Sequence, residues 1–148
     1  MERLCYYQAV KGKRTRHAVH NMTYHLVWCP KYRHRALTNP VAKRLDQLLR
    51  SKVTELEGEV VALEIQPDHV HLFAKFPPTL TVCQIMHHLK GYTSYTLRRE
   101  FPRLKQRLPS LWTRPYYVGT AGEVSAETIR RYIEAQRGCW EQRNDRCC

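Results

Sequence analysis

Two histidines, His69 and His71, stand two residues apart in the segment QPDHVHLFAKFP. The rest of the segment has the pattern of a strand, so both imidazoles project from one face, about 7 Å apart at roughly 3.3 Å rise per residue. Two neutral imidazoles at this separation can bind one metal ion. Two ligands do not make a site by themselves, and a surface or hydrogen-bonded histidine pair explains the spacing as well.

A tyrosine and a glutamine offer further chemistry, in the helix-like segment AETIRRYIEAQRGCW. Tyr132 and Gln136 are four residues apart, so their side chains share one helical face. The Gln136 carbonyl could complete a metal site with the two histidines. A phosphate polarised by that metal would suit attack by Tyr132, because an unactivated phenol is a weak nucleophile at neutral pH. Core packing beside Ile129 and Ile133 would also account for Tyr132.

Hydrophobic periodicity and capping residues predict the elements that position these groups. We expect strands at residues 21–29, 60–66, 69–76 and 116–122, and helices at residues 40–58, 81–101 and 125–138. Thr81 and Gln84 form a T-x-x-Q capping box, and residues 102–115 are expected to form a long loop. The order β-α-β-β-α-β-α predicts an α+β, ferredoxin-like (split βαβ) antiparallel sheet with helices on one face, plus a C-terminal helix that carries Tyr132.

Alternation along the strands predicts which side chains face the core. After the Pro67-Asp68 turn, one face carries Val70, Leu72, Ala74 and Phe76, and the reverse carries His69, His71 and Phe73. In the preceding strand, Val61, Leu63 and Ile65 are expected to share a face. Asp68 could hydrogen-bond the imidazole of His69, but a Pro-Asp turn needs no such role and we interpret Asp68 as a turn residue. We interpret His25, His87 and His88 as surface, packing or DNA-contact positions.

Taken together, His69-Val70-His71 and Tyr132-x-x-x-Gln136 resemble the HUH endonucleases, in which a histidine-hydrophobe-histidine strand and a helical tyrosine cleave single-stranded DNA. More narrowly, the chain resembles the insertion sequence 200-like (TnpA) single-tyrosine transposases, for which YHLVWCPKYRHRAL, PDHVHLF, LKGYTSYTLRREFP and YIEAQ are typical. The resemblance covers residues 21–140. We therefore expect an HUH transposase/endonuclease domain at 21–140, a basic arm at 1–20 and a tail at 141–148.

The resemblance implies a mechanism and partners. Tyr132 would be the catalytic nucleophile, and His69, His71 and Gln136 would hold Mg²⁺ or Mn²⁺, although imidazole ligands by softness favour a transition metal. The substrate would be single-stranded DNA with imperfect hairpins, cut and rejoined through a 5′-phosphotyrosine intermediate. The family works as a homodimer in which the tyrosine helix of one subunit can complete the site of the other, with Gly119 and Gly122 as a hinge.

The formal net charge of +12, from 25 Lys and Arg against 13 Asp and Glu, favours a polyanionic partner, with nucleic acid as the first candidate. The segment KGKRTRHAVH at residues 11–20 predicts a flexible basic arm. A solvated surface charge explains any single cation equally well. The candidate DNA-binding residues are Lys11, Lys13, Arg14, Arg16, Lys31, Tyr32, Arg33, Arg35, Lys90, Arg98 and Arg99.

The composition also indicates the cellular location of the protein and the classes of partner that we expect. Its apolar runs are too short to cross a bilayer, no signal-peptide pattern follows Met1, and the six scattered cysteines predict reduced thiols. We expect a cytoplasmic protein with no membrane partner and no small-molecule substrate. Two other functions remain open: a domesticated host nuclease that processes palindromes, and a non-enzymatic ferredoxin-like module that binds RNA or single-stranded DNA.

Overall fold

A four-stranded antiparallel sheet with the strand order β4-β5-β3-β6 forms the centre of the computed structural model. The structure describes residues 12–14, 16, 18–121, 127–129, 131–132 and 134–135. The sheet strands are β3 (Thr23–Trp28), β4 (Glu59–Gln66), β5 (His69–Lys75) and β6 (Tyr117–Ala121). Because β5 inserts between β4 and β3, the order is that of a split βαβ plan. The predicted α+β, ferredoxin-like fold is confirmed.

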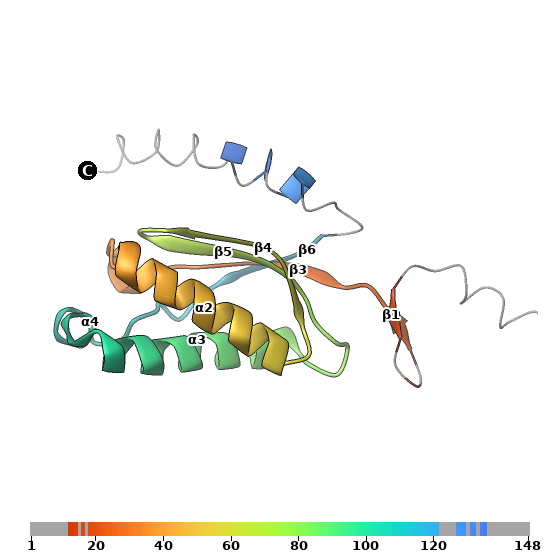
Figure 1. Cartoon of the computed structure of the whole chain (residues 1–148), viewed down its shortest axis with the longest axis horizontal. Helices are drawn as coiled ribbons and strands as arrows, with labels where there is room; N and C mark the ends of the chain where they lie inside the picture. The colour runs from red at the N-terminus through yellow and green to blue at the C-terminus, as the bar shows by residue number, and fades with distance from the viewer. Residues whose placement is uncertain are drawn as a thin grey trace, which may run out of the picture.

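Two long helices cover one face of this sheet, α2 (Asn39–Glu55) and α3 (Val82–Glu100). Figure 1 shows the described parts of the C-terminal helix on the opposite face, where residues 127–129, 131–132 and 134–135 are helical. The sheet thus separates a thick hydrophobic layer from a thinly covered face. The predicted boundaries at residues 20 and 140 stay a prediction.

The strand β5 places side chains on both faces of the sheet, as the alternation in its sequence predicts. Val70, Leu72 and Ala74 are fully buried and pack in the main core with the apolar stripes of α2 and α3. On the reverse, Phe73 forms a smaller cluster with Ile129 of the C-terminal helix. The larger cluster stabilises the fold. The smaller one holds the described part of the C-terminal helix, through Ile129, against the opposite face of the sheet.

Local signals place both helices against the sheet. Pro40 lies in the first turn of α2, where its missing N–H costs nothing. The predicted capping box of α3 is present: Thr81 Oγ1 accepts from the Gln84 backbone N–H at 3.2 Å, and the Gln84 side chain accepts from the Thr81 N–H at 2.9 Å.

Two local predictions were wrong. Val61 does not share a face with Leu63 and Ile65, because a register shift between Val60 and Ala62 turns Val61 toward the Phe73 cluster. The segment expected to be a loop begins with a short helix, α4 (Pro102–Arg107), which opens on a proline at its first position and buries Leu104.

The basic segment near the N-terminus contains regular structure. Lys13–Arg14 (β1) and Val19–His20 (β2) pair as a two-stranded antiparallel sheet, and Lys13 bonds Glu59 of β4 at 3.2 Å. The loop after β3 forms a single 3-10 turn, Lys31–Arg33 (η1). In the part of the chain that the structure describes, no helix is long and apolar enough to span a membrane.

Candidate functional site

The two histidines lie side by side on the sheet face opposite to the main core. His69 is 7% exposed and His71 is 3% exposed, and their ring centroids are 4.9 Å apart at an interplanar angle of 81°. Burial lowers the pKa of His71 to about 4, with smaller contributions from His69 and His25. His71 is therefore a neutral imidazole at physiological pH, the state in which histidine binds metals.

A third histidine joins the pair from the neighbouring strand. His25 of β3 lies opposite Phe73 of β5, stacks on its ring with a centroid distance of 4.1 Å, and places Nε2 at 3.1 Å from His71 Nδ1. Burial lowers the pKa of His25 as well. The sequence analysis interpreted His25 as a surface, packing or DNA-contact position and did not predict its contact with His71, because its position in β3 shows no short spacing to that residue. Only the pairing of β3 with β5 brings them together.

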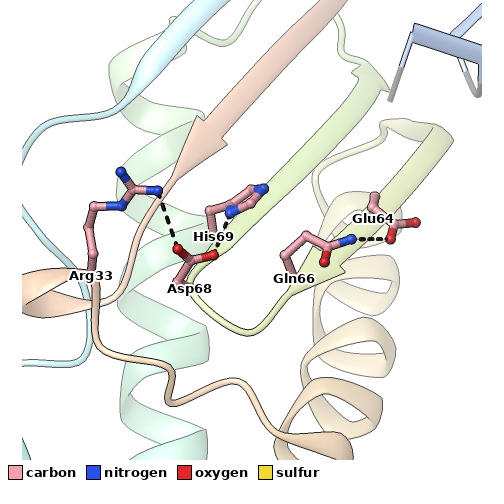
Figure 2. A network of polar contacts seen from close by, with 5 residues as sticks. All are labelled: Arg33, Glu64, Gln66, Asp68 and His69. Atoms are coloured by element: carbon pink, nitrogen blue, oxygen red, sulfur yellow. Dashed lines mark hydrogen bonds and ion pairs between the residues drawn. The ribbon is translucent and has the colours of Figure 1, made fainter. Parts of the chain in front are cut away.

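His69 is held by the turn that precedes it. Figure 2 shows the His69 Nδ1–H donating to Asp68 Oδ1 at 2.7 Å, while Arg33 Nη2 donates to Asp68 Oδ2 at 3.2 Å. Asp68 therefore does more than form the turn. Tyr32 and Arg33 adopt positive φ values of 59° and 49°, a region that costs non-glycine residues free energy, and this turn carries Arg33 to the carboxylate.

These contacts set which ring nitrogen can bind a metal. The carboxylate of Asp68 accepts from Nδ1–H of His69, so a neutral His69 carries its lone pair on Nε2. In the tautomer in which His71 Nδ1–H donates to His25 Nε2, the lone pair of His71 is on Nε2 as well. Such outer contacts orient metal-bound histidines in proteins generally. The donor set thus fits a divalent ion held through Nε2 of both rings.

The third metal ligand predicted from sequence, Gln136, lies outside the described residues. No group of three His, Cys, Asp or Glu side chains in the described part of the chain could hold a metal ion. Glu64 and Gln66 of β4 are register partners of His71 and His69 and bond each other at 2.7 Å, as Figure 2 also shows. A complete site therefore needs a donor beyond the two histidines, and Gln136 stays the prediction for it.

The predicted nucleophile, Tyr132, stands over the same sheet face. Its ring meets His25 at a centroid distance of 5.7 Å and Phe73 at 6.4 Å, both edge to face. One turn earlier, Ile129 is buried against Phe73. Tyr132 itself is 47% exposed. This segment thus has an apolar anchor that presents the tyrosine beside the histidines, within the same chain.

Several predicted DNA-binding cations bond the chain itself. Their partners are carboxylates or backbone carbonyl oxygens of the same chain. These contacts fix the positions of the cationic side chains and of the loops that they join. Lys13 pairs with Glu59 and Arg33 with Asp68, both at 3.2 Å; Lys90 donates to Thr113 O at 2.6 Å and Arg114 O at 2.9 Å; Arg98 donates to Leu108 O at 3.3 Å.

Other predicted contacts are open to solvent. Tyr32 is 74% exposed, with Lys31 Nζ over its ring at 5.7 Å, and Arg99 lies over the exposed ring of Tyr95 at 5.5 Å. Arg16 and Arg35 are exposed as well. Lys11 and the side chain of Arg14 lie outside what the structure describes. Exposed rings beside cations are the combination that stacks bases and neutralises phosphates.

Comparisons with known proteins find similar sequences along most of the chain. The family model described as "Transposase IS200 like" matches residues 18–136. The ISDra2 transposase TnpA of Deinococcus radiodurans is 36% identical over 126 residues, which cover 84% of this chain and 90% of the relative. The transposase for insertion sequence element IS200 of Salmonella typhimurium is 34% identical over 122 residues, 81% of this chain and 80% of the relative.

Solved structures give the same result for the fold. A crystal structure described as a proposed transposase from Deinococcus radiodurans superposes with a TM-score of 0.70 at 38% identity, covering 84% of this chain and 97% of the other. A REP-associated tyrosine transposase bound to a REP hairpin superposes with a TM-score of 0.55 at 13% identity, covering 83% and 68%. The second likeness concerns the fold alone.

Proposed function

We propose that this chain, which belongs to the IS200-like family of transposases, cuts and rejoins single-stranded DNA at hairpin-marked element ends through a 5′-phosphotyrosine on Tyr132. One observation carries the proposal. Tyr132 stands edge to face over His25, whose Nε2 lies 3.1 Å from His71, so an exposed phenol adjoins a buried group of imidazoles.

In the proposed step, Tyr132 Oη attacks the scissile phosphorus. A new bond forms between phosphorus and the phenolic oxygen, the bond to the 3′ oxygen of the upstream nucleotide breaks, and that oxygen leaves as a free 3′-hydroxyl with the proton that the phenol releases. The reverse attack by a 3′-hydroxyl rejoins the strand, because the phosphotyrosine bond keeps the energy of the phosphodiester.

The histidines would supply the metal site. His69 and His71, with Gln136 as the predicted third ligand, would hold Mg²⁺ or Mn²⁺, which polarises the phosphate and neutralises developing charge when bound. Asp68 fixes the ring of His69 and His25 that of His71. These contacts keep both rings in one orientation before DNA arrives, which lowers the cost of assembling the site.

The remaining surface fits a nucleic-acid substrate. The chain carries a formal net charge of +12, and its turn at Lys31–Arg33 exposes Tyr32 beside cations. We include a homodimer in the proposal, supported by the edge strand β6, where Val118 is 40% exposed.

A denaturing gel tests this function. Purified full-length protein is incubated with end-labelled single-stranded DNA that carries imperfect hairpins, with Mg²⁺ or Mn²⁺ and with EDTA. We expect a slowly migrating covalent adduct that needs metal and is lost in Tyr132→Phe and His71→Ala. Tyr92→Phe, which removes a phenol oxygen from α3 on the far side of the sheet, is the matched control and should keep the adduct. Protein that binds these DNAs but forms no adduct would favour a binding module instead.

A further inference from the structure

A small pocket lies beside the proposed nucleophile and is used by nothing described above. Its volume is about 240 Å³, and it opens between β6 and the C-terminal helix. Its lining includes His25, Phe73, Tyr117, Gly119, Ile129 and Tyr132. Neither His69 nor His71 lines it. It is therefore a separate space that adjoins the histidine group through His25.

The walls of this pocket are aromatic. Its lining includes the stacked pair of His25 and Phe73, whose ring centroids are 4.1 Å apart and whose planes are only 7° from parallel. Tyr117 and Tyr132 each meet the ring of His25 edge to face, at centroid distances of 5.6 and 5.7 Å and interplanar angles of 70° and 90°. Tyr117 is 58% exposed and Tyr132 is 47% exposed. Adjoining aromatic side chains that are open to solvent in a pocket mark a candidate binding site.

Gly119 keeps the pocket in this form. It pairs with His25 across the sheet, and a Cβ at this position would lie 2.8 Å from the Tyr117 hydroxyl oxygen. Any larger residue would require the hydroxyl end of the exposed Tyr117 side chain to shift from its present place. The glycine therefore serves the close approach of the tyrosine ring, which forms one wall.

The chemistry of the lining selects the occupant. Among the described residues around the pocket there is no Lys, Arg, Asp or Glu, and its polar groups are the tyrosine hydroxyls, the His25 ring and two threonines. A phosphate would find no counter-charge among these residues. A flat, neutral ring would find parallel and edge-on aromatic surfaces, which is how proteins hold unpaired bases. The volume lies below the roughly 300–1,000 Å³ of pockets for drug-sized ligands and suits one ring system.

We propose that this pocket binds one unpaired nucleobase of the DNA strand, next to the phosphate that Tyr132 attacks. The inference rests on the proposed function for the identity of the strand. Stacking of this base holds the scissile phosphate at the phenol oxygen, so Tyr117 acts as a positioning residue and the pocket contributes to the choice of cleavage site.

Photocrosslinking tests the pocket independently of cleavage. Tyr132→Phe protein is mixed with single-stranded hairpin DNAs in which 5-iododeoxyuridine replaces each base in turn, irradiated, and digested for mass spectrometry. We expect a crosslink on Tyr117 or Phe73 from one position of the strand. Crosslinks that fall only on other residues would overturn the proposal, whether or not the unmutated protein forms an adduct.

Kinetics give the second test. Because stacking contributes roughly 1–3 kcal/mol per base, Tyr117→Ala should slow adduct formation about 5- to 150-fold. Tyr117→Phe, which keeps the ring, should stay near the unmutated rate. An abasic site at the crosslinked position should slow the unmutated protein but add nothing to Tyr117→Ala. Equal loss from the abasic site in both proteins would contradict the pocket while leaving the proposed function intact.

Gly119→Ala provides a variant that does not remove the ring. Its methyl group would lie 2.8 Å from the Tyr117 hydroxyl in the unmutated background, whereas Tyr117→Phe leaves only the ring-carbon contacts at 3.3 and 3.4 Å, which need a smaller shift. We therefore expect Gly119→Ala to slow adduct formation more in the unmutated protein than in Tyr117→Phe. The same loss in both backgrounds would count against the proposal. Circular dichroism and thermal unfolding establish that each variant is folded.

Discussion

Asp68 offers the sharpest perturbation of the histidine site, because its carboxylate joins the ring of His69, a proposed metal ligand, to Arg33, which is 35 residues away in the sequence. Its Oδ1 accepts from His69 Nδ1 at 2.7 Å and its Oδ2 accepts from Arg33 at 3.2 Å. Asp68→Ala removes both contacts and lets the His69 ring rotate and change tautomer. Loss of such an outer partner typically weakens metal binding about 10- to 100-fold, or roughly 1.4–2.7 kcal/mol.

The burial of Asp68 sets a lower limit on the expected loss of metal affinity. The Asp68 side chain is 16% exposed, so solvent screens the contact only in part, and we expect Asp68→Ala to weaken binding by at least about tenfold. Asp68→Asn keeps an oxygen that can accept from Nδ1–H but loses the charge that Arg33 pairs with. Its effect should be smaller. The order Ala worse than Asn tests whether the hydrogen bond to His69, more than the net charge, is what matters.

Isothermal titration of Mn²⁺ into the full-length, DNA-free protein measures the effect. Nitrogen chemical shifts of the histidine rings report the His69 tautomer in the same samples. Asp46→Ala is the matched control, because Asp46 also pairs with an arginine, Arg50, at 2.7 Å but lies on α2. An affinity within twofold of the unmutated protein for folded Asp68→Ala, with the His69 tautomer unchanged, would refute the reasoning.

Three further outcomes follow from buried polar groups. His25→Phe should keep the stack on Phe73 but remove the partner of His71 Nδ1, weakening Mn²⁺ binding about tenfold by titration. Thr93→Val removes the buried acceptor of Trp112 Nε1 at 3.0 Å, so urea unfolding should show a loss of about 1–3 kcal/mol. Because the pKa of His71 falls from 6.5 to about 4 on folding, the unfolded chain of the metal-free protein takes up a proton first as pH drops. Neutral His71 therefore contributes about 3 kcal/mol to the free energy of unfolding above pH 6.5, and this contribution is lost progressively as the pH falls to 4.

Each outcome has a result that would contradict it. Unchanged Mn²⁺ affinity in His25→Phe would mean that the contact to His71 does not orient that ring. An equal stability of Thr93→Val and the unmutated protein would mean that the indole finds another acceptor. For the pH dependence, the comparison is His71→Gln in EDTA, which should lose most of the slope between pH 6.5 and 4. The full slope in that variant would assign it to other groups.

Patterns with a short period were predictable from the sequence. The alternation in β5 placed His69 and His71 opposite the apolar core, and the capping box located the start of α3. The face of Val61 was not predictable in the same way, since a register shift in one strand leaves no mark in its own alternation. The short helix at Pro102–Arg107 was missed because six residues give too little periodicity to recognise.

The candidate site was predictable only where its members are close in the chain. His25 and Arg33 are far from His71 and Asp68 in sequence, and the antiparallel pairing of β3 with β5 and the positive-φ turn at Tyr32 bring them in. The aromatic pocket depends on Gly119 and Tyr117 of the last strand meeting His25. Contacts between residues far apart in the sequence depend on how the strands pair. Local sequence patterns do not reveal that pairing.

The most direct test of the central claim is to identify the atom that carries the DNA. Protein that has reacted with hairpin-bearing single-stranded DNA and Mn²⁺ is digested with nuclease and protease, and the modified peptide is sequenced by mass spectrometry. The account predicts a nucleotide joined by its 5′ phosphate to Tyr132. A nucleotide on any other residue, or one joined through its 3′ phosphate, would contradict it.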